Sequence, residues 1–184
     1  MPEKQLPNLT ANSCLQDFSG LLLLFVYGTL KRGYWNYKKF CQGVLSVENG
    51  AVPGRLYEQT TGIPMLQIPP ESILASGSDD PLADVALQNR YSDRTPLTTA
   101  DLQTDNTGRW NWVQGEILTF NDPAIRLPAI DALERFKPEG PSRYQRVLVP
   151  VMVDSGKNII VWLYIAANKM PQTAKWLSGG IWPE

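Results

Sequence analysis

The chain has 184 residues, 43% of them hydrophobic, and its 17 Lys and Arg nearly balance its 18 Asp and Glu, for a net charge of −1. There is no basic excess to neutralise a phosphate backbone, so we expect no nucleic acid partner. The sequence contains no histidine, which excludes Ser–His and Cys–His nucleophile pairs and most catalytic zinc sites. Acid–base chemistry near neutral pH must therefore use Glu, Asp, Lys, Tyr or Cys.

Residues 1–20 are polar, contain Pro and lack periodicity, which predicts a loose leader. The apolar run at 21–26 is far shorter than the ~20 residues that span a bilayer, and no small-residue cleavage site follows it. We expect no membrane partner and a cytoplasmic location. Cys14 and Cys41 are too few for a disulfide framework. Pairing stays open beside two free thiols, and a reducing compartment favours the free thiols.

The first half of the chain predicts strands around one short helix. The continuous apolar run from Leu21 to Tyr27 ends at a glycine and predicts a strand buried on both faces. Residues 35–40 predict a short helix. Between Gly43 and Leu56 the chain carries an Asn-Gly and a Pro-Gly pair. Both pairs are turn signals, so we expect two further strands there.

Residues 69–111 differ in composition, because they are rich in Ser, Thr, Asp, Asn and Pro and have no sustained period. We expect one domain over 21–184, with this segment as an insertion that holds one short helix from Leu82 to Asn89. A structureless loop of that length is unusual in a compact domain. The segment is therefore either functional or partly disordered, and if it is functional, a role at the site and a role as a partner-docking arm both stay open.

Regular patterns resume at Trp110, where residues 110–120 alternate as a strand does. Apolar residues then recur at helical spacing, and Pro128 suits a first turn, which predicts a helix from Leu127 to Phe136. Two β-rich runs, 144–153 and 158–166, predict a hairpin with Ser155-Gly156 at its tip. We expect the Trp-containing tail to be packed.

The turn after the first strand, Tyr27-Gly28-Thr29-Leu30, is the first candidate site. Gly28 has no side chain to keep backbone amides away from a ligand. Successive exposed N–H groups after a strand form an anion-binding nest, suited to a carboxylate or an oxyanion. An ordinary turn is the alternative.

Three residues near the C-terminal helix are further candidates. Glu134 lies at the edge of the apolar stripe, where partial desolvation raises the pKa of a carboxyl and makes it a better base. A solvated helix face beside Arg135 is the alternative. Tyr144 and Arg146, at the start of the next strand, are suited to contact a ligand, to fix Glu134, or to join a loop to a helix end.

Five motifs occur in order along the chain: FVYGTLKRG, PGRLYE, VQGEILTF, IDALERF and YQRVLVPV. In this order and spacing they resemble the gamma-glutamylcyclotransferase-like family, also called AIG2-like. The opening motif is most similar to the gamma-glutamylamine cyclotransferase branch and its bacterial relatives. The resemblance implies an α+β fold, in which a small, strongly curved mixed sheet or barrel with flanking helices carries a pocket.

The resemblance also implies a reaction in which the α-amine of a γ-glutamyl compound attacks its own γ-carbonyl, releasing 5-oxoproline and an amine or peptide. Glu134 matches the catalytic position, and Tyr27, Gly28, Thr29 and Leu30 match the substrate-binding loop. Tyr144 and Arg146 are expected to bind substrate. No metal or cofactor is implied. Arg135 stands where the family commonly has Gly. The leaving group and oligomeric state stay open, and a non-catalytic small-molecule binding module is the alternative function.

Overall fold

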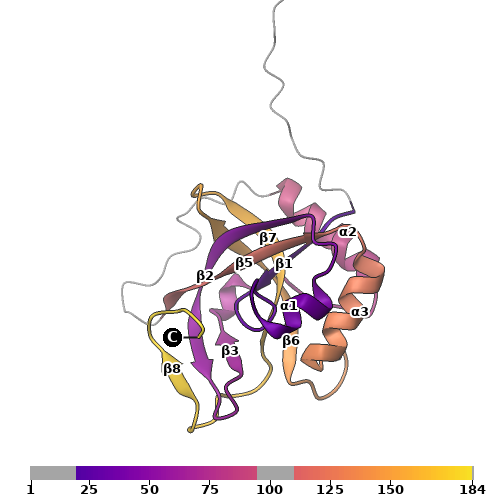
Figure 1. Cartoon of the computed structure of the whole chain (residues 1–184). Helices are drawn as coiled ribbons and strands as arrows, with labels where there is room; N and C mark the ends of the chain where they lie inside the picture. The colour runs from indigo at the N-terminus through magenta and orange to yellow at the C-terminus, as the bar shows by residue number, and fades with distance from the viewer. Residues whose placement is uncertain (1–19, 95–109, 184) are drawn as a thin grey trace, which may run out of the picture.

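Residues 20–94 and 110–183, which the computed structural model describes, form strands, α-helices and one 3₁₀ turn (Figure 1). The strands are β1 (Leu22–Val26), β2 (Ser46–Glu58), β3 (Pro64–Gln67), β4 (Ala75–Ser76), β5 (Asn111–Phe120), β6 (Tyr144–Val153), β7 (Asn158–Ala166) and β8 (Lys175–Leu177). The helices are α1 (Trp35–Phe40), α2 (Pro81–Arg94) and α3 (Pro123–Glu134), with the 3₁₀ turn η1 at Pro70–Ser72.

Five strands close into a barrel in the order β2-β5-β1-β7-β6, with β6 returning to β2. All neighbours are antiparallel except β1 and β7, which run parallel with Leu24 opposite Trp162. Strands β3 and β8 flank one end of β2, and β4 pairs with β6. The expected α+β fold with a strongly curved barrel is confirmed.

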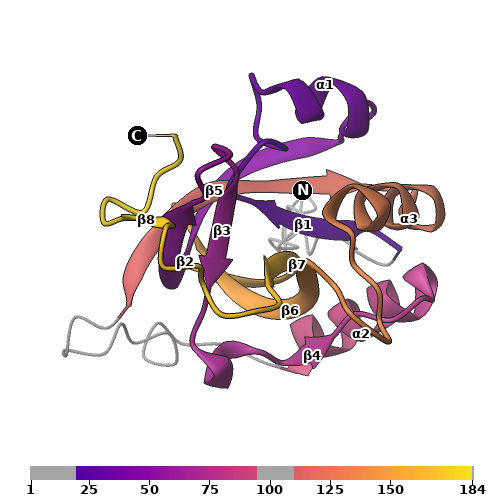
Figure 2. The same cartoon turned by 90° about the horizontal axis from the view of Figure 1, so that it is seen from below.

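The hydrophobic core has two layers that share β1. Leu23 and Phe25 point into a cluster built from every barrel strand, which is the barrel interior. Leu22 and Leu24 point the other way, into a cluster that includes Leu127 of α3 and Val85 of α2. Both views show α2 and α3 on the same side of the barrel (Figures 1 and 2). The prediction that the first strand is buried on both faces is confirmed.

The two strands predicted between Gly43 and Leu56 are one long strand, β2, so that prediction is wrong. Gly50 serves close packing rather than a turn: a Cβ there would lie 2.9 Å from a Val151 methyl and 3.1 Å from Ile117. Gly50 also pairs with both β5 and β6. Glycine lets the strands approach where the barrel closes.

The predicted start of the C-terminal helix is also wrong, because α3 begins at Pro123 and carries Pro128 in its interior. Ile125, which the pattern assigned to the apolar stripe, is exposed, whereas Leu127 and Ile130 are buried. Proline is common in the first turn of a helix. In α3 the first-turn proline is Pro123, not Pro128.

Other elements follow their predictions more closely. The helix at 35–40 and the hairpin with Ser155-Gly156 at its turn are confirmed. The tail is packed at Leu177 and Trp182, whereas Trp176 is 46% exposed. Within the segment 69–111, the short helix is present but longer, as α2. The leader, except for residue 20, and residues 95–109 lie outside the described residues, as does Cys14.

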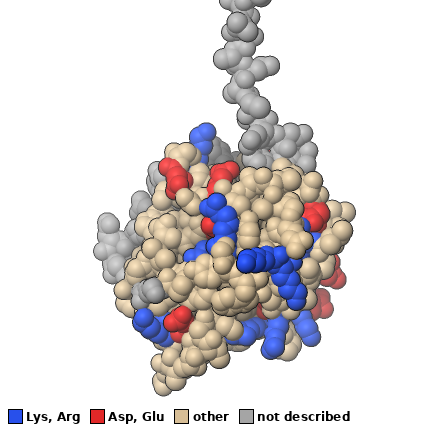
Figure 3. All heavy atoms as spheres, viewed as in Figure 1, with Lys and Arg blue, Asp and Glu red and all other residues tan. Residues whose placement is uncertain are grey.

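Charged side chains are interspersed on the viewed face, with Lys and Arg in small separate groups (Figure 3). In the described part of the chain, no helix is long and apolar enough to cross a membrane.

Candidate active site

A cavity of about 390 Å³, counting its open mouth, lies where β1 ends. Its walls come from β1 and the turn after it, the start of β3, the end of α3, and strands β6 and β7. The lining residues are Phe25, Val26, Tyr27, Gly28, Thr29, Leu30, Ile63, Pro64, Glu134, Tyr144 and Tyr164. The structure therefore brings six of the seven predicted site residues to one cavity, and Arg146 is the one it does not.

The turn after β1 is held in place from outside the cavity. The carboxylate of Glu116 accepts the backbone N–H of Arg32 at 2.8 Å and its Nε–H at 2.9 Å. The N–H of Lys31 closes the turn on the Gly28 carbonyl at 3.0 Å. Among the described residues we find no acceptor for the N–H groups of residues 28, 29 and 30. These amides are free to receive an anion, as the nest interpretation requires.

Gly28 has a second reason to be glycine. A Cβ at this position would lie 2.6 Å from the Cγ of Pro64, which forms the facing wall of the cavity. A side chain at residue 28 would therefore displace Pro64.

Glu134 is the last residue of α3, and it is the sole ionisable carboxylate among the lining residues. Burial raises the pKa of its carboxyl to about 7, against the lowering effect of the nearby Arg143 charge and with a smaller rise from Asp131. No described group donates a hydrogen bond to this carboxylate. It therefore has both the proton affinity and the free lone pairs of a general base.

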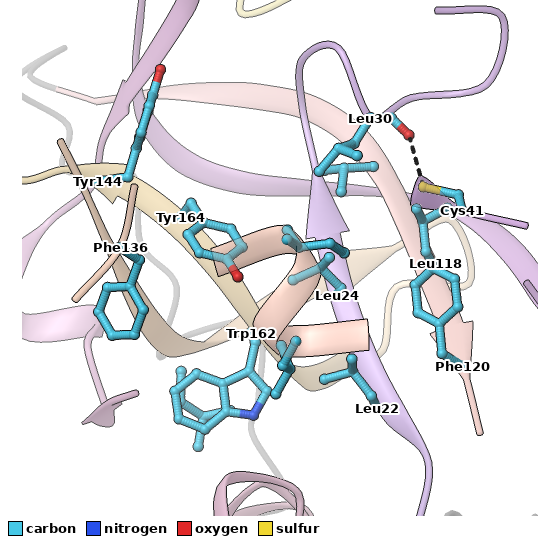
Figure 4. Close-up of a cluster of buried hydrophobic side chains, with 14 of the residues drawn as sticks. Leu22, Leu24, Leu30, Cys41, Leu118, Phe120, Phe136, Tyr144, Trp162 and Tyr164 are labelled. Atoms are coloured by element: carbon cyan, nitrogen blue, oxygen red, sulfur yellow. Dashed lines mark hydrogen bonds between the residues drawn. The ribbon is translucent and has the colours of Figure 1, made fainter. Parts of the chain in front are cut away.

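The three tyrosines of the cavity already use their hydroxyl protons. Tyr27 donates to the Tyr164 carbonyl at 2.9 Å, Tyr144 to the Pro64 carbonyl at 2.9 Å, and Tyr164 to Asp131 at 2.6 Å. Burial also raises the pKa of each hydroxyl. These side chains shape the walls rather than supply acids. Figure 4 shows Tyr144 and Tyr164 across the cluster from Leu30, whose carbonyl faces the buried Cys41 thiol.

Arg146 lies away from the cavity, with its side chain fully buried. Its guanidinium donates to Asp84 and Asp131, and to the Ser78 carbonyl at 2.8 Å. Since Asp131 is one turn before Glu134 on α3, this cluster fixes the end of the helix that carries Glu134. Arg146 is thus placed to fix Glu134, one of the three roles that the sequence left open, and it does not line the cavity.

Sequence reasoning missed four residues that the structure makes important. Ile63, Pro64 and Tyr164 line the cavity, and Asp131 joins Arg146 to Tyr164. Asp131 had a usable signal, since it lies three residues before Glu134 on the same helix face. The others had none, because strand pairing brings them to the site.

Arg135 ends α3 in the left-handed conformation, with φ 53° and ψ 39°. Glycine adopts this conformation without steric cost and is the usual residue at such a helix end. The Arg135 side chain is exposed and does not line the cavity. Its bulk therefore leaves the space around Glu134 unchanged.

The family model for gamma-glutamyl cyclotransferase, AIG2-like proteins matches residues 24–78 and 83–184. The chain belongs to this family. None of the curated proteins compared with it matches.

Three solved structures are similar to this chain, and the two with TM-scores above 0.5 share its fold. An AIG2-like protein from Mus musculus is 21% identical over 83% of this chain and 82% of its own, with a TM-score of 0.48. YkqA from Bacillus subtilis is 18% identical over 88% of this chain, with a TM-score of 0.51, but the match spans 39% of YkqA. At5g39720.1 from Arabidopsis thaliana is 16% identical over 86% of this chain and 77% of its own, with a TM-score of 0.51.

For this AIG2-like chain, the described residues contain no group of three or more Cys, Asp or Glu side chains placed to hold a metal ion. The polar groups that line the cavity include the Glu134 carboxylate, the backbone amides of residues 28–30 and the Thr29 hydroxyl.

Proposed function

We propose that the protein is a γ-glutamylcyclotransferase that converts a small γ-glutamyl compound into 5-oxoproline. The observation that carries this proposal is the pairing, in one cavity, of an unpartnered Glu134 with the free amides of the Tyr27–Leu30 turn. A carboxylate whose pKa is about 7 is suited to take a proton from an ammonium group at neutral pH.

The reaction needs no second substrate. Glu134 removes a proton from the substrate's α-ammonium group, and the free amine attacks the γ-carbonyl carbon. The new C–N bond closes the five-membered ring, and negative charge develops on the carbonyl oxygen. Glu134 then returns the proton to the leaving nitrogen as the original amide C–N bond breaks. It also takes the second proton from the ring nitrogen, which becomes the neutral lactam N–H, and that proton leaves with the released amine as its ammonium. Because nucleophile and carbonyl belong to one molecule, the main task of the protein is to hold the folded conformer.

The amides of residues 28–30 have two uses in this scheme. They are suited to hold the α-carboxylate of the glutamyl group, or to offset the charge that develops on the carbonyl oxygen. The walls around them are apolar or hydroxyl-bearing, since Ile63, Pro64 and the tyrosines complete the cavity. Such surroundings strengthen each hydrogen bond to a charged group.

The test is release of 5-oxoproline from a panel of γ-glutamyl amines, γ-glutamyl dipeptides and glutathione. Glu134→Gln removes the base and keeps the shape, and we expect it to abolish release. Glu139→Gln is the matched control, because Glu139 is exposed and lies five residues further along. Full activity in Glu134→Gln would remove Glu134 from the mechanism. If the folded protein binds 5-oxoproline but turns over none of the panel, the alternative, a non-catalytic binding module, is favoured.

The best substrate in the panel would identify the leaving group. The residues that bind the glutamyl group do not determine it, because every substrate in the panel carries the same glutamyl group. A cytoplasmic location, where a reducing environment keeps Cys41 as a thiol, is part of the same proposal and is tested by cell fractionation.

A further inference from the structure

A hydrogen bond joins helix α1 to the turn that lines the cavity. The Nδ2 of Asn36, the second residue of α1, lies 2.8 Å from the Oγ1 of Thr29. Both residues are half-buried, and Thr29 lines the cavity whereas Asn36 does not. Asn36 therefore acts on the cavity through Thr29.

The direction of this hydrogen bond determines what Thr29 offers to a ligand. A side-chain NH₂ group only donates, whereas a hydroxyl has one proton to donate and two lone pairs to accept with. Thr29 is thus the acceptor, and its own proton is not used by Asn36. No described residue accepts this proton either. With the three free amides, the turn presents several donors on the wall of the cavity that it forms, and this wall suits a carboxylate.

Helix α1 packs against the core only through its half-buried residues Tyr37 and Phe40. None of its residues is buried. Arg126 of α3 holds its far end by donating to the carbonyls of Phe40 and Gln42, and the buried Cys41 follows it. At the N-terminal end of α1, the Asn36–Thr29 hydrogen bond joins the helix to the turn. These contacts hold α1 in place, and α1 in turn brings the amide donor of Asn36 to Thr29.

We propose that Asn36 is a positioning residue, which turns the Thr29 hydroxyl proton toward the α-carboxylate of the glutamyl group. This rests on the proposed function, because it assumes that the cavity binds that group. In this arrangement Asn36 has no contact with substrate, and it contributes to affinity only while residue 29 has a hydroxyl.

The experiment is equilibrium binding of 5-oxoproline, which keeps the carboxylate and needs no turnover. Four proteins form a double-mutant cycle: wild type, Thr29→Val, Asn36→Ala and the double variant. Loss of a hydrogen bond to a charged group predicts about tenfold weaker binding for Thr29→Val. We expect Asn36→Ala to weaken binding about threefold to tenfold in the wild type, and to have no further effect on Thr29→Val.

Two further variants separate positioning from general stability. Thr29→Ser keeps the hydroxyl and should keep most of the affinity. Gln42→Ala removes another amide side chain just after α1, where Gln42 donates to the Lys38 carbonyl at 3.1 Å, and should leave binding unchanged. A loss from Asn36→Ala that is equal in both backgrounds would overturn this proposal and leave the proposed function standing. If the folded wild type binds no 5-oxoproline, both fall.

Discussion

The buried cluster around Arg146 makes a strong prediction about stability. Arg146→Met would leave Asp84, which is 2% exposed, and Asp131 without their shared cation. Removing one partner of a buried ion pair costs about 3–5 kcal/mol. For a chain of this size, each kcal/mol lowers Tm by roughly 2–4 °C, so we expect a fall of about 6–20 °C. Methionine fills much of the same volume, and the loss therefore reports the charges rather than a cavity.

The loss should depend on pH in a defined direction. Burial already raises the pKa of Asp131, while its bond from Tyr164 and the Arg146 charge lower it. Removing Arg146 raises the folded-state pKa further above the unfolded value. An ionised Asp131 then costs stability that protonation recovers. The deficit of the variant should be largest at neutral pH and should shrink as the pH falls toward 5, as measured by urea unfolding across this range.

Two comparisons make the test specific. Arg32→Met removes an ion pair whose arginine is 53% exposed, and a surface pair of that kind is worth at most about 1 kcal/mol. Adding Asp84→Asn and Asp131→Asn to Arg146→Met should restore most of the lost stability, because no buried charge is left unpaired. Unchanged stability in Arg146→Met, together with a raised KM for the substrate, would refute this reasoning and return Arg146 to a substrate-binding role.

Three other changes have outcomes that the geometry fixes. Because Glu134 must be ionised to act as the base, kcat/KM should fall below pH 7 with a midpoint set by its pKa of about 7, and a pH–rate profile that stays flat from 6 to 8 would contradict this. Arg135→Gly should stabilise the protein by about 0.5–1 kcal/mol in urea unfolding, since φ is 53° there, and Arg135→Ala should show no such gain. Gly28→Ala places a Cβ 2.6 Å from Pro64, so we expect a stability loss of about 1–3 kcal/mol and weaker substrate binding, with partial recovery in the double variant with Pro64→Ala.

Local sequence signals were sufficient for much of this fold. The run from Leu21 to Tyr27 predicted a strand buried on both faces, because polar alternation was missing, and β1 lies between the two core layers. The hairpin of β6 and β7 was readable from two β-rich runs and a Ser-Gly tip. These features depend on residues that are close in the sequence, where propensity and turn chemistry act.

Long-range contacts account for what could not be predicted. The Asn-Gly pair at Gly50 was interpreted as a turn. A glycine is needed there because Val151 and Ile117 pack against it, and both lie in strands more than 60 residues away in the sequence. Arg146 looked like a ligand residue because its partner Asp84 lies 62 residues away. Ile63 and Pro64 reach the cavity only because β3 pairs with β2. No spacing within a single element carries such information.

The cavity brings together two walls of opposite electrostatic character. The sequence predicted each wall as a separate candidate site: the turn after β1 and Glu134 at the end of α3. On one wall, burial and the C-terminal end of α3 both disfavour the ionised form of Glu134. On the other, the amides after β1 and the Thr29 hydroxyl favour an anion. An α-amino acid group has a cationic ammonium and an anionic carboxylate on one carbon. Such a group satisfies both walls when its ammonium faces Glu134 and its carboxylate faces the turn. In the proposed reaction, this orientation directs the nitrogen to the carboxylate that would remove its proton.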